Sequence, residues 1–169
     1  LVRVLLRLPR RRAPARAAPK VTILLVHAWG MGGTIRTMLN VAGRLAERHE
    51  VEVLSVWRTR DEPFFAFPPG VAVVAADDRR PARAGPAARL LGRLPGPLLF
   101  PGDRTSRRMT LWTDLQLVRR LRASRPDVLI GTRPALNLLV AGVGGGRARV
   151  ATEHAPFRAY RHWLKREIR

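Results

Sequence analysis

Residues 20–34 read Lys-Val-Thr-Ile-Leu-Leu-Val-His-Ala-Trp-Gly-Met-Gly-Gly-Thr, a nearly continuous apolar run followed by a glycine-rich turn. Such a run predicts a strand at 21–26 that is buried on both faces, as strands of a parallel sheet are. Thr34 is the expected N-cap of a following helix. Apolar side chains then recur at intervals of three and four over residues 35–48, which predicts one apolar helical face.

The alternation of strand and helix continues along the chain. It predicts an α/β fold, a Rossmann-like doubly wound parallel sheet with right-handed crossovers. Proline- and arginine-rich residues 76–105 are expected to form a surface excursion rather than core. Further strands are expected at 51–56, 71–75, 127–131 and 149–152, and helices at 87–94, after Thr105 or Ser106, and at 135–143.

Two prolines bound the later helices. Pro126 is expected to close the helix that precedes it, and Pro134 suits the first turn of the next one. Gly144–Gly146 are expected to stop that last helix. The inner face of the helix before Pro126 is predicted from apolar residues at nearly every third position, which are Met109, Trp112, Leu115, Val118 and Leu121.

The 169 residues carry a net charge of +20, which invites a nucleic-acid interpretation. However, only Lys20 and Lys165 are lysines, and the abundance of Arg, Ala, Gly and Pro is typical of GC-rich coding. We therefore expect no nucleic-acid partner and leave attraction to an anionic membrane surface open. The absence of cysteine excludes disulfides and thiolate metal sites, and a cytoplasmic location is expected, with or without attachment to the inner face of the membrane.

The ends of the chain differ in character from its middle. Residues 1–19 mix arginine and proline and are expected to be a disordered basic leader, with the folded domain at 20–160. Residues 161–169 lie in a charged, helix-like stretch and are expected to begin a following segment that is cut short. Since the chain starts at Leu1 rather than Met, we expect a fragment of a longer protein.

Other families with glycine-rich loops fit the sequence poorly. A phosphate-binding P-loop needs a lysine before the threonine, and Gly33-Thr34 has none. A dinucleotide-binding turn that begins at Gly30 would need glycine where Ile35 stands. An α/β-hydrolase needs a serine flanked by glycines in the Gly-x-Ser-x-Gly pattern, which no serine of this chain has.

Four segments together resemble glycosyltransferase family four. They are Lys20–Val26 with Gly32-Gly33-Thr34-x-Arg36, the helix from Asn40 that leads into His49-Glu50-Val51, Arg125–Ile130, and Thr152-Glu153-His154. The resemblance implies one half of a GT-B architecture, in which two Rossmann-like domains face a cleft. The N-terminal half mainly holds the acceptor, and the C-terminal half, to which nothing here corresponds, binds a nucleotide-sugar. The family retains configuration and usually needs no metal, and no cofactor is expected beyond the donor itself.

The resemblance also implies which residues of the glycine turn bind substrate. Gly32 and Gly33 would face the donor phosphates or the acceptor, with Thr34 as a further binding residue. A helix N-terminus without Cβ atoms nearby favours anions, although the glycines would equally suit a tight turn. Arg36 would contact a phosphate or, in so basic a chain, simply be solvated.

At the end of the last predicted strand, His154 matches the family's cleft histidine, which contacts the transferred sugar. It is the implied catalytic residue, because an imidazole can exchange hydrogen bonds as charge develops on the sugar. Glu153 is either a second polar contact or a capping acid. His27 and His49 are expected to be structural, and no metal site is expected.

The connection 57–70 contains Phe64, Phe65 and Phe67, which is unusual for an exposed loop. Three interpretations stay open: the aromatic residues line an acceptor pocket, enter a membrane interface, or pack over the sheet edge. The arginine-rich stretch 79–108 would support attachment to anionic lipid.

The sequence therefore predicts the acceptor-binding domain of a glycosyltransferase, inactive without its donor-binding half. The donor would be a nucleotide-sugar, and the acceptor a cell-envelope, lipid-linked or small molecule. The alternative is a non-catalytic, basic Rossmann-like module that binds an anionic ligand, a membrane surface or nucleic acid. The transferase interpretation requires that Gly32–Gly33 and His154 lie side by side at a single rim of a parallel sheet, and not on opposite edges.

Overall fold

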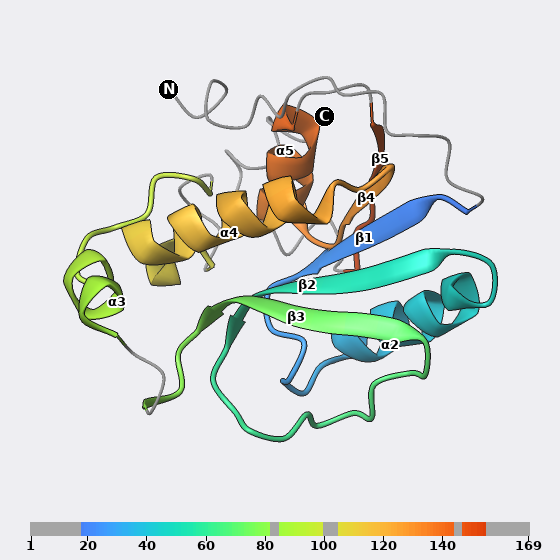
Figure 1. Ribbon diagram of the computed structural model, residues 1–169, viewed down its shortest axis with the longest axis horizontal. Coiled ribbons are helices and arrows are strands. Elements are labelled where there is room, and N and C mark those ends of the chain that lie inside the picture. Colours follow the sequence, from blue (N-terminus) through green and yellow to red (C-terminus); the bar gives the residue numbers. More distant parts are fainter. Residues whose placement is uncertain (1–17, 82–84, 100–104, 144–146, 155–169) are drawn as a thin grey trace.

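The computed structural model describes residues 18–81, 85–99, 105–143 and 147–154. Five strands form one sheet in the order β3-β2-β1-β4-β5, and every pair of neighbours is parallel, which confirms the predicted fold class (Figure 1). The strands are β1 (Lys20–Leu25), β2 (Glu50–Arg58), β3 (Val71–Asp78), β4 (Val128–Gly131) and β5 (Ala148–Ala151). The helices are α2 (Gly33–Ala46), α3 (Pro86–Leu91), α4 (Leu111–Ser124) and α5 (Pro134–Gly142), with a short 3₁₀ turn η2 (Ser106–Arg108).

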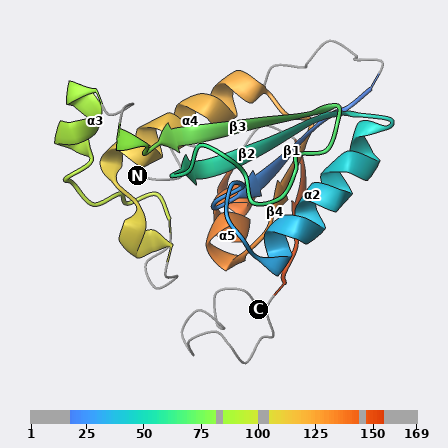
Figure 2. The same ribbon diagram turned by 90° about the horizontal axis from the view of Figure 1, so that it is seen from below.

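Helices cover both faces of the sheet. Side chains along β1 alternate between two apolar clusters, with Leu24 on one face and Ile23 and Leu25 on the other. The cluster around Leu24 includes apolar side chains of α4 and α5, and the opposite cluster includes those of α2. Both faces of the central strands are therefore buried, as the apolar run of β1 predicts. The views agree that α3 lies beyond the end of the sheet, past the arrowhead of β3 (Figures 1 and 2).

Two helix caps differ from the sequence prediction. Gly32, not Thr34, is the N-cap of α2, and Thr34 lies inside the first turn, where it makes no capping hydrogen bond. Helix α4 begins after Thr110, whose Oγ1 accepts a hydrogen bond from Thr113 N at 3.2 Å. Because Thr110 caps α4, the stretch at Thr105 and Ser106 forms only a separate 3₁₀ turn.

The predicted inner face of α4 is confirmed at Met109, Val118 and Leu121 but is wrong at Leu115. Leu121 is buried, but Leu115 is 49% exposed, and the buried apolar residue between them is Leu117. A spacing of three drifts around a helix of 3.6 residues per turn, so a stripe drawn at every third position includes Leu115 and omits the buried Leu117. The buried face instead includes polar side chains with distant partners, such as Ser124, whose Oγ lies 2.9 Å from Thr22 Oγ1.

The stretch predicted as a surface excursion is partly core. Strand β3 extends to Asp78, beyond the predicted end at residue 75. Leu98 and Leu99 are buried in the same cluster as Leu24, because hydrogen bonds hold their segment against α4. Residues 1–17, Gly144–Gly146 and 155–169 lie outside the described residues, so the predictions made for the leader, the glycine stop and the terminal segment remain predictions.

The loop after β2 packs against the turn after β1. Phe67 meets Trp29 edge to face at 5.2 Å between ring centroids, and Phe65 is half-buried against the α2 side of the core. Phe64 N donates a hydrogen bond to Trp29 O at 3.2 Å, while its ring is 52% exposed. Phe65 and Phe67 therefore pack on the apolar cluster that α2 covers, and Phe67 also contacts the β1–α2 turn.

Candidate functional site

The carboxyl ends of all five strands share one rim, because every neighbouring pair is parallel. From β1 the chain winds outwards through β2 to β3, then crosses back to β4 and continues to β5 on the other side. The direction of winding therefore changes between β1 and β4. In open α/β sheets, the crevice outside the strand ends at such a switch point is where ligands bind.

The side chain of Ser55 in β2 holds the turn after β1 in place through hydrogen bonds. Ser55 Oγ accepts a hydrogen bond from Ala28 N at 2.9 Å and donates one to Trp57 O at 2.7 Å, and its side chain is fully buried. Trp29 is also buried, with the Arg58 guanidinium 4.6 Å from its ring centroid. The backbone of this turn is thus held rigidly at the rim.

The two glycines of the turn have no steric reason to be glycines. A Cβ on Gly33 would meet open space, and one on Gly32 would only touch Ile35 at an ordinary 3.8 Å. Gly32 has φ 163°, an extended conformation that any residue adopts. No side chain caps α2 and no acid lies in its first turn, so the free N–H groups of that turn face outwards from the rim. The requirement for a tight turn therefore does not explain Gly33.

His27 lies in the same turn. Its Nε2 is 2.9 Å from Thr59 Oγ1, which joins the loops after β1 and β2. Burial lowers the pKa of His27, and the positive charge of Arg60 lowers it further, so the ring is neutral at neutral pH. Its buried Nδ1 has no partner among the described residues. The contact with Thr59 agrees with the structural role expected from the sequence, and it places an imidazole at the rim.

The end of β4 is built around two polar residues. Thr132 is buried, and its Oγ1 donates a hydrogen bond to Leu24 O at 2.6 Å, which ties β4 to β1 at the switch point. Asn137 of α5 lies so close to Gly131 that a Cβ there would come within 3.0 Å of the Asn137 Cα. Asn137 Nδ2 also donates to Thr152 O at 2.9 Å, so this side chain sets the path of the chain after β5.

The residues after β5 present Glu153 and His154 at the rim. Thr152 is anchored because its N and its Oγ1 both donate to Gly131 O, at 2.9 and 2.8 Å. His154 is exposed, and its Nε2 lies 3.3 Å from Thr152 Oγ1. Glu153 is exposed as well, and its Oε1 accepts a hydrogen bond from His154 N at 3.0 Å. This contact joins adjacent residues, so the choice between a second polar contact and a capping acid for Glu153 remains a prediction.

The glycine turn and His154 lie at the same rim but not on adjacent strands. Strand β4 lies between β1 and β5, and parallel neighbours are about 4.8 Å apart, so the strands that lead to the two groups are roughly 10 Å apart. A ligand that touched both would cross the end of β4 at Thr132. The shared rim of a parallel sheet agrees with the prediction, but the two groups do not lie side by side, because β4 separates their strands.

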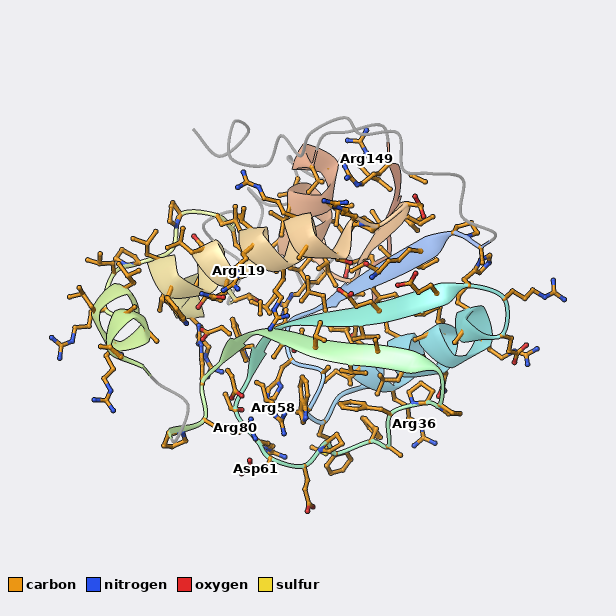
Figure 3. All side chains as sticks on the ribbon, viewed as in Figure 1. Arg36, Arg58, Asp61, Arg80, Arg119 and Arg149 are labelled. Atoms are coloured by element: carbon orange, nitrogen blue, oxygen red, sulfur yellow. The ribbon has the colours of Figure 1, made fainter. Side chains whose placement is uncertain are left out.

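Figure 3 shows Arg58 and Arg80 close together beside Asp61, with Arg36 apart from them. Arg36 is exposed on α2 and lies 5.8 Å from the Phe65 ring centroid, so it packs on an aromatic ring and remains open to solvent. Arg80 binds Asp78 and Asp61, each at 2.6 Å, and its hydrogen bonds lower the pKa of Asp78. Arg80 is therefore neutralised locally, whereas Arg36 keeps an exposed positive charge close to the start of α2.

Sequence reasoning missed Ser55, Thr132 and Asn137, which shape this rim. Each had a weak signal, because each is a polar residue in or beside a run that is otherwise apolar. Such a residue needs a hydrogen-bond partner when it is buried, but the sequence does not identify the partner.

Within the described segments, no group of three or more His, Asp or Glu side chains is arranged to hold a metal ion. The same segments contain no helix that is long and apolar enough to cross a bilayer. The groups described at the rim are backbone N–H groups, imidazoles, hydroxyls, an arginine and the Glu153 carboxylate. Such groups bind phosphates and sugar hydroxyls.

Sequence comparison relates the chain to known proteins. A sequence profile described as Glycosyltransferase Family 4 matches residues 31–169. A Streptomyces coelicolor protein named as an exopolysaccharide phosphotransferase is 37% identical over 147 residues. That alignment covers 81% of this chain and 15% of the length of the relative, so the chain spans a small part of that protein. No solved structure matches the chain significantly.

Proposed function

Because the chain belongs to glycosyltransferase family 4, we propose that it is the acceptor-binding half of an enzyme that transfers a sugar from a nucleotide-sugar. The acceptor would be a hydroxyl of a cell-envelope, lipid-linked or small molecule, held over the rim at the end of β4. A second, donor-binding domain would complete the cleft. This domain alone would then bind an acceptor without turning it over.

The observation that carries the proposal is the open Gly33 at the start of α2. Its missing Cβ leaves room for a ligand, and the first-turn N–H groups and Arg36 supply positive potential there. His154 lies across the end of β4, where it would reach the sugar while the phosphates lie against α2. A phosphate at one end and a sugar at the other match the two chemically different parts of a nucleotide-sugar.

In glycosyl transfer, the bond between the anomeric carbon and the phosphate oxygen breaks, and the acceptor oxygen takes its place. The leaving group is a nucleoside diphosphate, whose growing negative charge the N-terminus of α2 would stabilise. His154 would exchange a hydrogen bond with the sugar as positive charge develops on its ring. Exposure of this imidazole at the rim allows that contact.

A second candidate reaction is transfer of a sugar phosphate, which the name of the Streptomyces relative favours. In that reaction the acceptor oxygen attacks the phosphorus next to the sugar, and the bond between the two phosphates breaks. The leaving group is then a nucleoside monophosphate, and the sugar keeps its bond to the transferred phosphate. The anion-binding end of α2 would serve both reactions, so the rim alone favours neither.

The released nucleotide distinguishes these reactions. The full-length protein is incubated with a panel of nucleotide-sugars and candidate acceptors, and the nucleotides are separated by chromatography. A nucleoside diphosphate indicates glycosyl transfer, and a monophosphate indicates sugar-phosphate transfer. Failure to release any nucleotide would favour a binding module without catalysis.

The matched variants are His154→Ala and His49→Ala. We expect His154→Ala to lower kcat by about a hundredfold with little change in stability, since its ring is exposed and makes one long hydrogen bond. His49 lies at the far end of α2, away from the rim, and its replacement should leave kcat within about twofold. Wild-type turnover in His154→Ala would remove His154 from the mechanism.

A further inference from the structure

An open groove of about 290 Å³ lies along α4, away from the strand-end crevice at β1 and β4. Leu98 lies on one side of it, and Leu111, Leu115 and Val118 of α4 supply most of its apolar wall. Arg119 and Arg122 add their side chains to the same lining. Residues 115, 118, 119 and 122 share one face of the helix, so this face carries apolar and basic side chains together.

A buried carboxylate forms part of the groove lining. Asp114 is 5% exposed, and its Oδ2 accepts a hydrogen bond from Leu98 N at 2.8 Å. Its Oδ1 has no partner among the described residues. Burial raises the pKa of Asp114 to about 6, against the opposing effect of the Leu98 hydrogen bond. A buried acceptor without a donor is costly, so a ligand that donates a hydrogen bond there would be favoured.

Exposed leucines surround the groove. Leu115 is 49% exposed in its wall, Leu94 is 48% exposed, and Leu90 of the adjacent α3 is 66% exposed. Helix α3 contacts α4, and Leu111 N donates to Leu94 O at 3.0 Å, so these leucines belong to one surface. Water-exposed leucines of this number on one small surface indicate a site that is covered by an apolar partner.

The same surface is strongly basic. Among the residues described between 85 and 124, Asp114 is the single acid, and it is buried. The arginines of this stretch that lie exposed are Arg89, Arg93, Arg107, Arg108, Arg119, Arg120 and Arg122. A partner of this surface should therefore be anionic as well as apolar.

We propose that the α4 groove binds an anionic phospholipid with a hydroxyl-bearing headgroup and thereby attaches this domain to a membrane surface. The headgroup hydroxyl donates to Asp114 Oδ1, the phosphate lies against Arg119, and the first acyl carbons lie on Leu115 and its apolar neighbours. Long arginine side chains lie with their stems along the apolar surface and their charges at the headgroups.

A bilayer fits these observations better than a polar partner does. Nucleic acid would satisfy the arginines but would leave the leucines against a highly charged strand. An anionic bilayer satisfies both, because its headgroups carry charge and its acyl region takes up leucines. The proposal does not depend on which group the rim transfers.

The test is sedimentation of the full-length protein with vesicles in the absence of any sugar donor. Three vesicle compositions are compared: phosphatidylcholine alone, and phosphatidylcholine with equal fractions of phosphatidylglycerol or phosphatidylmethanol. The last two lipids carry the same phosphodiester charge, but phosphatidylmethanol has no headgroup hydroxyl. We expect binding to follow phosphatidylglycerol, with about a fivefold preference over phosphatidylmethanol.

Two pairs of variants locate the contact. Arg119→Gln should weaken binding to phosphatidylglycerol vesicles about fivefold, whereas Arg120→Gln, at the next position of α4, should weaken it by about twofold or less. Leu115→Gln should weaken binding by a similar amount, and Val41→Gln on α2 should leave it unchanged within about twofold. All four side chains are exposed, so each variant should fold, and circular dichroism checks this.

Several results would overturn the proposal. Equal sedimentation with all three vesicle types, or equal effects within either pair of variants, would show that the α4 groove is not the contact. Equal binding to phosphatidylglycerol and phosphatidylmethanol would show that no hydroxyl meets Asp114. Displacement by soluble glycerol 3-phosphate would show that the groove takes a free phosphate rather than a bilayer. Nucleotide release is measured separately, so the two proposals can fail independently.

Discussion

The replacement Asp114→Asn should make the protein more stable at neutral and alkaline pH. Asparagine keeps the shape of the side chain, and its Oδ1 can accept the Leu98 N–H bond that Asp114 Oδ2 accepts now. The change removes a negative charge that is 5% exposed and that has one oxygen without a partner. Burial is the larger cause of the raised pKa, so the charge itself is what the fold disfavours.

The size of the effect follows from the pKa of Asp114. Its pKa rises from 3.8 to about 6, a shift of about two units, and each unit corresponds to about 1.4 kcal/mol. The ionised carboxylate therefore costs the folded protein about 3 kcal/mol once the pH exceeds 6. The new amide leaves its NH₂ group without a partner, which costs about 1–2 kcal/mol. A net stabilisation of about 1–2 kcal/mol remains at about pH 8.

The sign of the pH dependence follows from the same two values. Between 3.8 and about 6 the folded protein binds more protons at Asp114 than the unfolded chain does. The contribution of Asp114 to the free energy of unfolding is therefore most favourable below that window, falls as pH rises through it, and is constant above it. Asparagine does not titrate, so the advantage of the variant should grow through this window. At about pH 4 the cost of the unpaired amide remains, and the variant should be less stable than wild type by about 1 kcal/mol.

Urea denaturation of wild type and Asp114→Asn, followed by circular dichroism between about pH 4 and 8, measures this difference. Asp78→Asn is the matched control, because hydrogen bonds from Arg80 lower the pKa of Asp78 and its replacement should destabilise the protein at pH 8. The reasoning is wrong if Asp114→Asn is less stable than wild type at pH 8, or if the difference between them is the same at every pH.

Five other substitutions, two of which are controls, test the packing and the helix caps of the fold. Gly131→Ala should cost about 1–3 kcal/mol of unfolding free energy, because the new Cβ meets the Asn137 backbone. Gly33→Ala should be neutral or should stabilise the protein by up to about 1 kcal/mol. Equal urea midpoints for the two variants would contradict this. Thr110→Ala should cost about 1 kcal/mol through loss of the α4 N-cap, and Thr34→Ala, which removes no cap, should cost less in the same assay. Ser55→Ala should cost about 1–3 kcal/mol and speed hydrogen exchange of the Ala28 amide, and an unchanged exchange rate would show that Ser55 does not hold the turn.

The sequence predicted the strand, turn and helix that form the rim, but it did not predict the contacts between them. The apolar run from Val21 and the glycines after it gave the correct strand, turn and helix, because the repeat of apolar residues reflects which faces are buried. The resemblance to family 4 was confirmed by the match over residues 31–169. The roles of Gly32, Gly33, Thr34, Arg36, Glu153 and His154 in binding or catalysis remain predictions.

The errors arose where a local pattern competed with a distant contact. Leu115 was assigned to the core of α4, but the helix turns Thr113 and Ser124 inwards, because Asp77 and Thr22 of the sheet supply their hydrogen bonds. Leu98 was assigned to the surface, but its N–H group binds Asp114 and the side chain enters the core. Such partners are not visible in a window of neighbouring residues.

By itself, the sequence determined the order of strands and helices, the parallel sheet and the family, since each depends on patterns within about 15 neighbouring residues or on short motifs. Tertiary structure alone decided that β4 lies between the glycine turn and His154, and that Asp114 is buried in a groove beside exposed leucines. Thr132 and Leu24 meet across 108 positions of sequence, and Thr22 and Ser124 across 102. Contacts over such separations depend on how the whole chain packs, and no local repeat of residues encodes them.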